Sequence, residues 1–253
     1  MELIVLGSGS SVPHPRRSSS GYWLNAVGGS LLLDCSASSI LRMAQEGCDW
    51  ANLDAIWISH FHLDHCGGLA PFLFGMKHAP ETQGREKPLR VFGPGGLRRV
   101  IEMFDSVNDY GLLKLPFPFE IIEVEAGKSF EPFLGLTGSV FSTPHTDESC
   151  AVRVEGTYGR SLVFTADTGY STNLGVFARG ADLLLAECSF IRDKPVKIHL
   201  EIADIAHLVR FAKPRRTVLT HLYPEWDGNE SEAMELLGEI HAEIAFDGMR
   251  VKL

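Results

Sequence analysis

The sequence has no apolar run long enough to cross a bilayer, which would need about 20 consecutive apolar residues. Its first apolar run, residues 3–6, is also too short for the hydrophobic part of a secretory signal, and Glu2 precedes it. These absences predict a protein with no membrane partner, and we expect it in the cytoplasm.

Cysteine is scarce, and its five positions form no recognisable framework. The number is odd, the spacing is irregular and no C-x-x-C pair occurs, so we expect no disulfide-stapled domain and a reducing compartment. Each thiol is most simply read as a small buried hydrophobic group. The five positions are Cys35, Cys48, Cys66, Cys150 and Cys188.

Positive charge is in deficit, with a formal net charge of −9 at pH 7 and a pI near 5.6. General nucleic-acid-binding proteins are usually basic, so the composition does not favour that class, although RNA stays compatible as a partner. No G-x-S-x-G motif occurs, and Val12 stands where a dinucleotide fingerprint needs its third glycine. Serine hydrolases of that kind and nucleotide-cofactor enzymes are therefore disfavoured.

What is present is an ordinary globular composition over 253 residues, enough for one large α/β domain. Apolar runs predict strands at residues 3–7, 31–34, 55–59, 89–92, 152–154, 161–165, 182–186 and 217–219, with further strands between 119 and 143. Helical periodicity predicts helices at residues 36–46, 67–78, 96–104, 202–211 and 231–240. Short strands with helices in both halves predict two packed sheets flanked by helices, and we expect residues 1–253 to form a single domain.

The most informative stretch follows the apolar strand at 55–58. It reads H-x-H-x-D-H and ends in two glycines, so that three imidazoles and one carboxylate occupy six positions: His60, His62, Asp64 and His65. Imidazole and carboxylate together suit Zn²⁺, Mn²⁺ or Fe²⁺. Because the strand has ended, a tight loop can aim the first two histidines at one point and the last two residues at another. This layout predicts two metal ions.

Three later residues complete the candidate site. His145, Asp167 and His221 each come directly after an apolar strand, and strand-end loops cluster along one edge of a sheet sandwich. Taken singly, each has a simpler reading as a turn cap or a solvated side chain. Their shared context favours a ligand role for all three.

These residues together resemble the metallo-β-lactamase superfamily, whose signature loop matches residues 60–65 and whose later motifs match the other three in order. The resemblance implies an αββα sandwich of two mixed sheets. It also implies one ion held by His60, His62 and His145, a second ion held by Asp64, His65 and His221, and Asp167 bridging both. Classical β-lactamases carry cysteine at the bridging position, so β-lactamase activity is disfavoured.

Within this superfamily the chain is similar to the ribonuclease Z and cyclic-phosphodiesterase branch. Residues 6–17 resemble the first loop of that branch, including Pro13 and Arg16, but Arg17 replaces a usual asparagine. Residues 184–190 resemble its glutamate motif, centred on Glu187, and His199 falls where the branch has an extra histidine. The long basic arm that ribonuclease Z inserts between the positions of His145 and Asp167 is missing, which lowers the expectation of tRNA as substrate.

The function that these features predict is dinuclear, metal-dependent hydrolysis of a nucleotide or of a cyclic or other small phosphodiester. A hydroxide bridging two cations, with Zn²⁺ first and Mn²⁺ or Fe²⁺ as alternatives, would attack the phosphorus. His199 is the candidate general acid, and Glu187 would orient it. Asp64, a ligand, completes the candidate catalytic set. Arg16 and Arg17 are candidates for contacts with a substrate phosphate.

Other readings stay open at this point. A ribonuclease Z-type tRNA 3′-end endonuclease is the main alternative, and a non-catalytic metal-binding protein is the alternative of another class. Relatives in this branch are often dimers, which implies a homodimer here. Asp34 is either a hydrogen-bond acceptor for a ligand histidine or a turn cap. Tyr223 and Trp226 either wall the pocket or pack the C-terminal helix.

Overall fold

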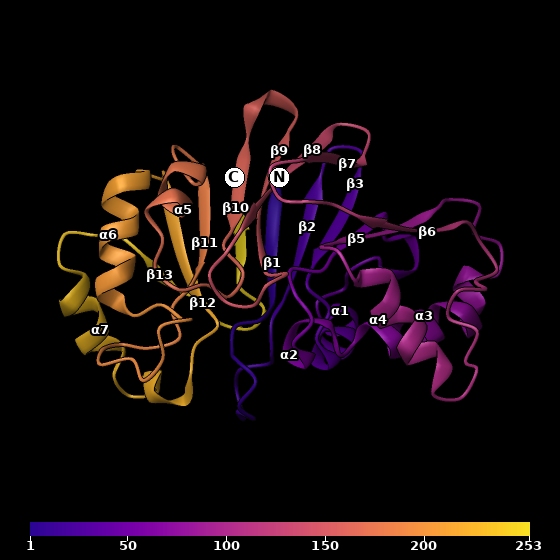
Figure 1. Cartoon of the computed structure of the whole chain (residues 1–253), viewed down its shortest axis with the longest axis horizontal. Helices are drawn as coiled ribbons and strands as arrows, with labels where there is room; N and C mark the ends of the chain where they lie inside the picture. Colours follow the sequence, from indigo (N-terminus) through magenta and orange to yellow (C-terminus); the bar gives the residue numbers. More distant parts are fainter.

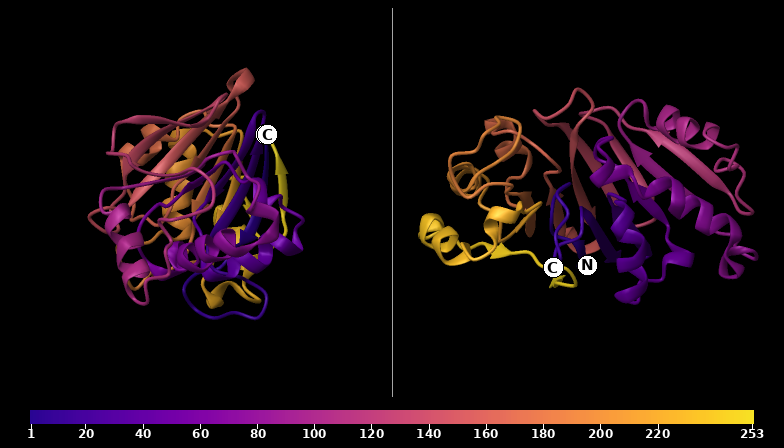
Figure 2. Two further views of the ribbon diagram at one scale, coloured as in Figure 1. Left: turned by 90° about the vertical axis from the view of Figure 1, so that its right-hand side faces the viewer. Right: turned by 90° about the horizontal axis from the view of Figure 1, so that it is seen from below.

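The structure is a computed structural model that describes residues 1–253, and it consists of two seven-stranded sheets packed face to face (Figure 1). Helices cover the outer face of each sheet (Figure 2). The predicted αββα sandwich of two mixed sheets is confirmed. None of the helices combines the length and the hydrophobicity that spanning a bilayer requires.

The two sheets are built in the same way. In the first, the order is β14 (Arg250–Lys252), β1 (Glu2–Gly7), β2 (Gly21–Ala26), β3 (Gly29–Leu33), β4 (Ala55–Trp57), β5 (Leu89–Gly93) and β6 (Phe119–Glu123). In the second, it is β13 (Glu243–Ile244), β12 (Arg216–Thr220), β11 (Leu183–Glu187), β10 (Ser161–Phe164), β9 (Cys150–Gly156), β8 (Leu136–Ser142) and β7 (Ser129–Phe133). Each sheet has an antiparallel part and a parallel part, joined at β3 and at β10.

Helices make the crossovers between the parallel strands, as parallel pairing requires. On the first sheet these are α1 (Ala37–Gln45), the single turn α2 (Leu63–Cys66), α3 (Leu69–His78) and α4 (Leu97–Ser106). On the second sheet they are α5 (Thr172–Phe177), α6 (Ile202–Ala212) and α7 (Glu230–Leu237). α6 begins with a capping box in which the side chains of Glu201 and Asp204 each accept a backbone N–H of the other residue.

Alternation along the strands explains why their sequences are apolar at almost every position. In β1, Leu3 and Val5 face the core between the two sheets, whereas Ile4 and Leu6 face the helices. In β11, Leu185 faces the inner core and its neighbours face the helices of the second half. Both faces of these strands are buried, so a continuous apolar run replaces an apolar–polar alternation.

Several local predictions are wrong. The strands β2 and β14, the short strand β13 and the helix α5 were not predicted, and α3 begins at Leu69 instead of Gly67. The stretch of ligand candidates is not a loop throughout, because Asp64 and His65 lie in the helical turn α2. That turn is held by the Cys66 N–H, which donates to the carbonyl of His62 at 2.9 Å.

Gly68, which follows this stretch, is sterically crowded, whereas Gly75 inside α3 is not. A Cβ on Gly68 would lie 2.2 Å from the carbonyl oxygen of Ser36, whereas a Cβ on Gly75 would meet nothing within 4 Å. We expect Gly68→Ala to lower the free energy of unfolding by about 1–3 kcal/mol, because the backbone of α1 must shift. Gly75→Ala should raise it by about 0.5–1 kcal/mol through helix propensity. Urea titrations of both variants check this, and equal effects would contradict it.

Candidate metal centre

The seven candidate ligands converge at one end of the sandwich, although they come from both sheets. His60 and His62 follow β4, and Asp64 and His65 lie in α2. The other three follow β8, β10 and β12 and are His145, Asp167 and His221. Their donor atoms form overlapping groups within which all atoms lie within 4.8 Å of one another.

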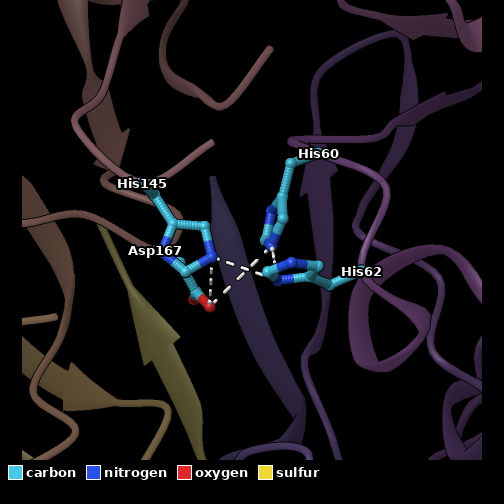
Figure 3. A group of neighbouring side chains, drawn as sticks. All are labelled: His60, His62, His145 and Asp167. Atoms are coloured by element: carbon cyan, nitrogen blue, oxygen red, sulfur yellow. Dashed lines mark hydrogen bonds and ion pairs between the residues drawn. The ribbon is translucent and has the colours of Figure 1, made fainter. Parts of the chain in front are cut away.

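The first group consists of three histidines and one aspartate (Figure 3). His62 Nδ1 lies 3.1 Å from His60 Nε2 and 3.1 Å from His145 Nε2. Asp167 Oδ2 lies 3.8 Å from His60 Nε2 and 3.7 Å from His145 Nε2. The three nitrogens and the carboxylate oxygen therefore face a common point, as ligands of one cation would.

The second group lies on the other side of Asp167 and contains Asp64, His65 and His221. Asp64 Oδ2 is 3.6 Å from His65 Nε2 and 3.4 Å from His221 Nε2. Asp167 is 3.3 Å from each of these two nitrogens, through Oδ1 and Oδ2 respectively. One carboxylate thus contacts both groups, which is the position that the resemblance implied for a bridging ligand.

The protonation states suit divalent cations. Burial, followed by the neighbouring His65, lowers the pKa of His60 to about 2, so this imidazole is neutral and has a free lone pair. Burial would raise the pKa of Asp64, but the neighbouring His221 and His65 together outweigh this effect, and the pKa falls to about 2. Neutral imidazoles beside ionised carboxylates are the donor set that zinc and similar metals prefer.

His65 provides a further test of fit. Its Nε2 atom is buried and has no hydrogen-bond partner. Burial alone would lower the pKa of this imidazole, yet the charges of Asp167 and Asp34 raise it well above its usual value. The surrounding carboxylates therefore favour positive charge at this point, and a bound cation would supply that charge and a partner for the orphaned nitrogen.

Asp34 contacts the candidate ligand His65 directly and also binds Ser59, the residue before His60. Its Oδ2 lies 2.7 Å from His65 Nδ1 and accepts the hydroxyl of Ser59 at 2.8 Å, while its Oδ1 accepts the Ser59 N–H at 2.7 Å. Asp34 is fully buried and has φ 57°, in the left-handed region that non-glycine residues rarely adopt. The acceptor role that the sequence left open is the one observed.

Glu187, the last residue of β11 in the second sheet, makes contacts that correspond to those of Asp34. Its Oε1 lies 2.9 Å from His199 Nδ1 and accepts the Thr168 N–H at 3.0 Å. The His199 ring lies 4.9 Å from that of His145 and 5.4 Å from that of His221, between centroids. Burial would lower the pKa of His199, but the hydrogen bond and charge of Glu187 outweigh it and raise the pKa. An imidazolium at the edge of the centre can donate a proton.

The two arginines of the first loop are ion-paired. Arg16 Nη2 lies 2.7 Å from Asp227 Oδ2, and Arg17 contacts the other oxygen of the same carboxylate. The Arg17 side chain is 10% exposed, whereas that of Arg16 is 72% exposed. His14 also contacts Asp227, at 2.8 Å, so one carboxylate holds the tip of this loop against η4 (Pro224–Trp226).

The two aromatic residues after His221 have different roles. Trp226 is fully buried in the helix-facing core of the second sheet, so it packs the fold. Tyr223 is half-buried, and its ring centroid lies 6.0 Å from that of His221 and 6.1 Å from that of His199. The ring centroid of Phe190 lies 4.9 Å from that of Tyr223. Tyr223 therefore borders the centre and Trp226 does not.

Sequence reasoning missed Ser189, whose hydroxyl lies 3.0 Å from His221 Nδ1. Its position beside Glu187 in the glutamate motif was a usable signal. The remaining histidines take no part in any of these groups: His14, His78, His207 and His241.

Two mixed sheets with flanking helices and a His/Asp centre at one end define a metallo-β-lactamase-fold hydrolase. The fold agrees with that of the metallo-β-lactamase-fold protein YhfI from Bacillus subtilis, with a TM-score of 0.81, 24% identity, and coverage of 99% of this chain and 98% of that one. More particularly, the chain belongs to the family of the Anti-Pycsar protein Apyc1, whose model matches residues 1–241.

Similarity to ribonuclease Z sequences places the chain in the ribonuclease Z-like branch. A ribonuclease Z from Myxococcus xanthus is 26% identical over 311 residues, covering all of this chain and 98% of that protein. The uncharacterized protein ML1173 from Mycobacterium leprae is 30% identical over 261 residues, covering 97% of this chain and 87% of that protein. The predicted superfamily and branch are confirmed.

Proposed function

We propose that this protein is a phosphodiesterase that uses two divalent metal ions, Zn²⁺ first among them, to hydrolyse a nucleotide or a cyclic or other small phosphodiester. The observation that carries this proposal is the position of Asp167 between two groups of donors, with the His199–Glu187 pair beside both. Mn²⁺ and Fe²⁺ are compatible with the two carboxylates of the set.

His60, His62 and His145 would hold one ion, Asp64, His65 and His221 the other, and Asp167 both. When bound, two such ions supply activation of water near neutral pH and neutralisation of the phosphate charge. Asp167 remains a carboxylate, because the charges of His221 and His65 outweigh the effect of burial and lower its pKa well below the usual value. This negative charge lies within 4 Å of histidine nitrogens in both groups of donors.

His199 would give its proton to the leaving oxygen of the substrate. Its Nδ1 is occupied by Glu187, so Nε2 is the atom that is free to donate. The carbonyl of Ile198 accepts a hydrogen bond from His145 Nδ1 at 3.0 Å, which fixes the segment before His199 against the centre. Lys194 Nζ donates to the carbonyl of His199 at 3.0 Å and secures the segment from the other side.

A small substrate is supported by the interval between His145 and Asp167, which holds only β9, a single 3₁₀ turn and β10. A net charge of −9 gives little general attraction for an RNA backbone. Half-buried Tyr223 offers an aromatic ring on which a base can stack. Arg16, with its exposed side chain, is our candidate for a contact with a substrate phosphate, while Arg17, at the same carboxylate, would support it.

A tRNA 3′-end endonuclease is the second candidate, because a ribonuclease Z is 26% identical over nearly its whole length. Incubation of metal-loaded protein with bis-p-nitrophenyl phosphate, a cyclic nucleotide and a precursor tRNA separates the candidates. We expect cleavage of the small esters, no cleavage of tRNA, and loss of activity with chelator. Cleavage of tRNA alone would favour the endonuclease, and cleavage of none with metals bound would favour a non-catalytic metal-binding protein.

We further propose that residues 1–253 act as one domain, as a homodimer in the cytoplasm. Residues of both sheets share the inner core, which supports one domain. The apolar side chains of Leu41 on α1 and Phe74 on α3 are 62% and 43% exposed, and covering them would stabilise a dimer. All five cysteines are free thiols, as a reducing compartment keeps them.

A further inference from the structure

Two serine hydroxyls occupy equivalent places in the two halves of the centre. Ser59 follows β4 and precedes His60, and Ser189 follows β11 and packs against His221. Both serines are fully buried. The Ser59 hydroxyl lies 3.0 Å from His60 Nδ1 and 2.8 Å from Asp34 Oδ2. Ser189 repeats this arrangement and lies 3.0 Å from His221 Nδ1 and 2.8 Å from Glu187 Oε2.

The surroundings fix the direction of these hydrogen bonds. Asp34 accepts the Ser59 N–H, and Glu187 accepts the N–H groups of Thr168 and Ser189, so both side chains act as acceptors. A hydroxyl has one proton and gives it to the carboxylate, which leaves its oxygen to accept from imidazole. His60 and His221 must then carry their proton on Nδ1. Their Nε2 lone pairs face the carboxylate of Asp167 at 3.8 and 3.3 Å.

We propose that Ser59 and Ser189 are positioning residues that hold His60 and His221 in the Nδ1–H tautomer, with Nε2 ready to bind a cation. Each serine acts on one donor group only, because His60 belongs to the first group and His221 to the second. This inference rests on the proposed function in one respect, namely that the two groups bind metal ions.

Glu187 gains a second role from this arrangement. Its Oε1 lies 2.9 Å from Nδ1 of His199, and its Oε2 reaches His221 through Ser189. One carboxylate therefore orients both the proposed proton donor and a ligand of the second group. Asp34 does the same for two ligands of different groups, His65 directly and His60 through Ser59.

The test measures metal affinity in four variants: Ser59→Ala, Ser189→Ala, Ser189→Thr and Ser20→Ala. Ser20 is the matched control, because its hydroxyl is equally buried but has no hydrogen-bond partner. Chelator competition with Zn²⁺ should show one of the two ions bound about 10- to 100-fold more weakly in each of the first two variants. Ser189→Thr keeps the hydroxyl and should recover most of the affinity, and Ser20→Ala should bind like the wild type.

A second measurement does not depend on metal or on activity. Long-range ¹H–¹⁵N spectra of the metal-free protein should show His60 and His221 as Nδ1–H tautomers, and each serine-to-alanine variant should lose this preference at its own histidine only. Wild-type affinity in both alanine variants, or Nε2–H tautomers in the wild type, would overturn the proposal even if phosphodiesters are cleaved. If the wild type binds no metal, the proposed function fails, while the tautomer result still decides the role of the serines.

Discussion

Replacement of Asp167 by asparagine is expected to reduce kcat/KM by at least about 10³-fold and the bound metal from two ions to at most one. The amide keeps the shape of the side chain but removes the charge that both donor groups share. Asp167 is the only carboxylate within 4 Å of Nε2 atoms in His60, His65, His145 and His221 at once. Elemental analysis of the dialysed variant, beside steady-state kinetics, checks this.

The control is Asp182→Asn, since Asp182 is also a hydrogen-bonded aspartate next to a strand of the second sheet. It accepts the Ser161 N–H at 2.9 Å and pairs with Arg160, before β11 begins and away from the centre. This variant should keep both ions and its turnover. An Asp167→Asn protein with two tightly bound ions and near-wild-type activity would refute the bridging role and, with it, the proposed dinuclear mechanism.

The second large effect is expected for His199→Gln, which should lower kcat about 10²- to 10⁴-fold for a substrate with an alkoxide leaving group. Both ions should remain bound. This measurement matters because His199 also lies near Asp167 and His221, in a third group of potential ligands. Loss of an ion from the variant would make His199 a ligand instead of a proton donor. The same kinetics with bis-p-nitrophenyl phosphate should show a much smaller loss, because nitrophenolate leaves without a proton.

The pH dependence of kcat provides a further test of His199 as the proton donor. A general acid works while protonated, so kcat should fall as the pH rises through the pKa of His199. Glu187 raises that pKa above its ordinary value, after burial has lowered it. Glu187→Gln should therefore move the alkaline limb of the kcat profile to lower pH, and His199→Gln should abolish it. An unchanged alkaline limb in both variants would assign the limb to another group.

The sequence predicted the architecture and the convergence of the candidate ligands, because both follow from local patterns. Strands buried on two faces leave continuous apolar runs, and each donor follows such a run directly. The missed strand β14 pairs with β1, and its residue Val251 lies opposite Leu3, so nothing local marks it. β2 was missed although Tyr22, Trp23 and Leu24 are apolar and buried, and although Gly28, with φ 96°, lies in the turn that joins it to β3.

The hydrogen bonds behind the donors were predictable only in part. Asp34 was recognised as a candidate acceptor, but its pairing with Ser59 and His65 depends on the ends of β3 and β4 meeting in space. The left-handed backbone at Asp34, Ala166 and His221 is likewise set by packing, because none of these residues favours it. Such strain gathers where tertiary structure overrides local preference.

The pairing of β14 with β1 means that the last residues of the chain complete the first sheet. Asp247, just before β14, accepts the Ser8 and Ser18 N–H groups at 2.9 and 2.8 Å and so anchors both ends of the loop that carries Arg16. A fragment ending at residue 241, where the family match stops, would leave the edge of β1 open to other strands and would release this loop. Any recombinant version designed to retain catalytic competence therefore has to include the C-terminal twelve residues, even though they contribute no donor atom to the centre.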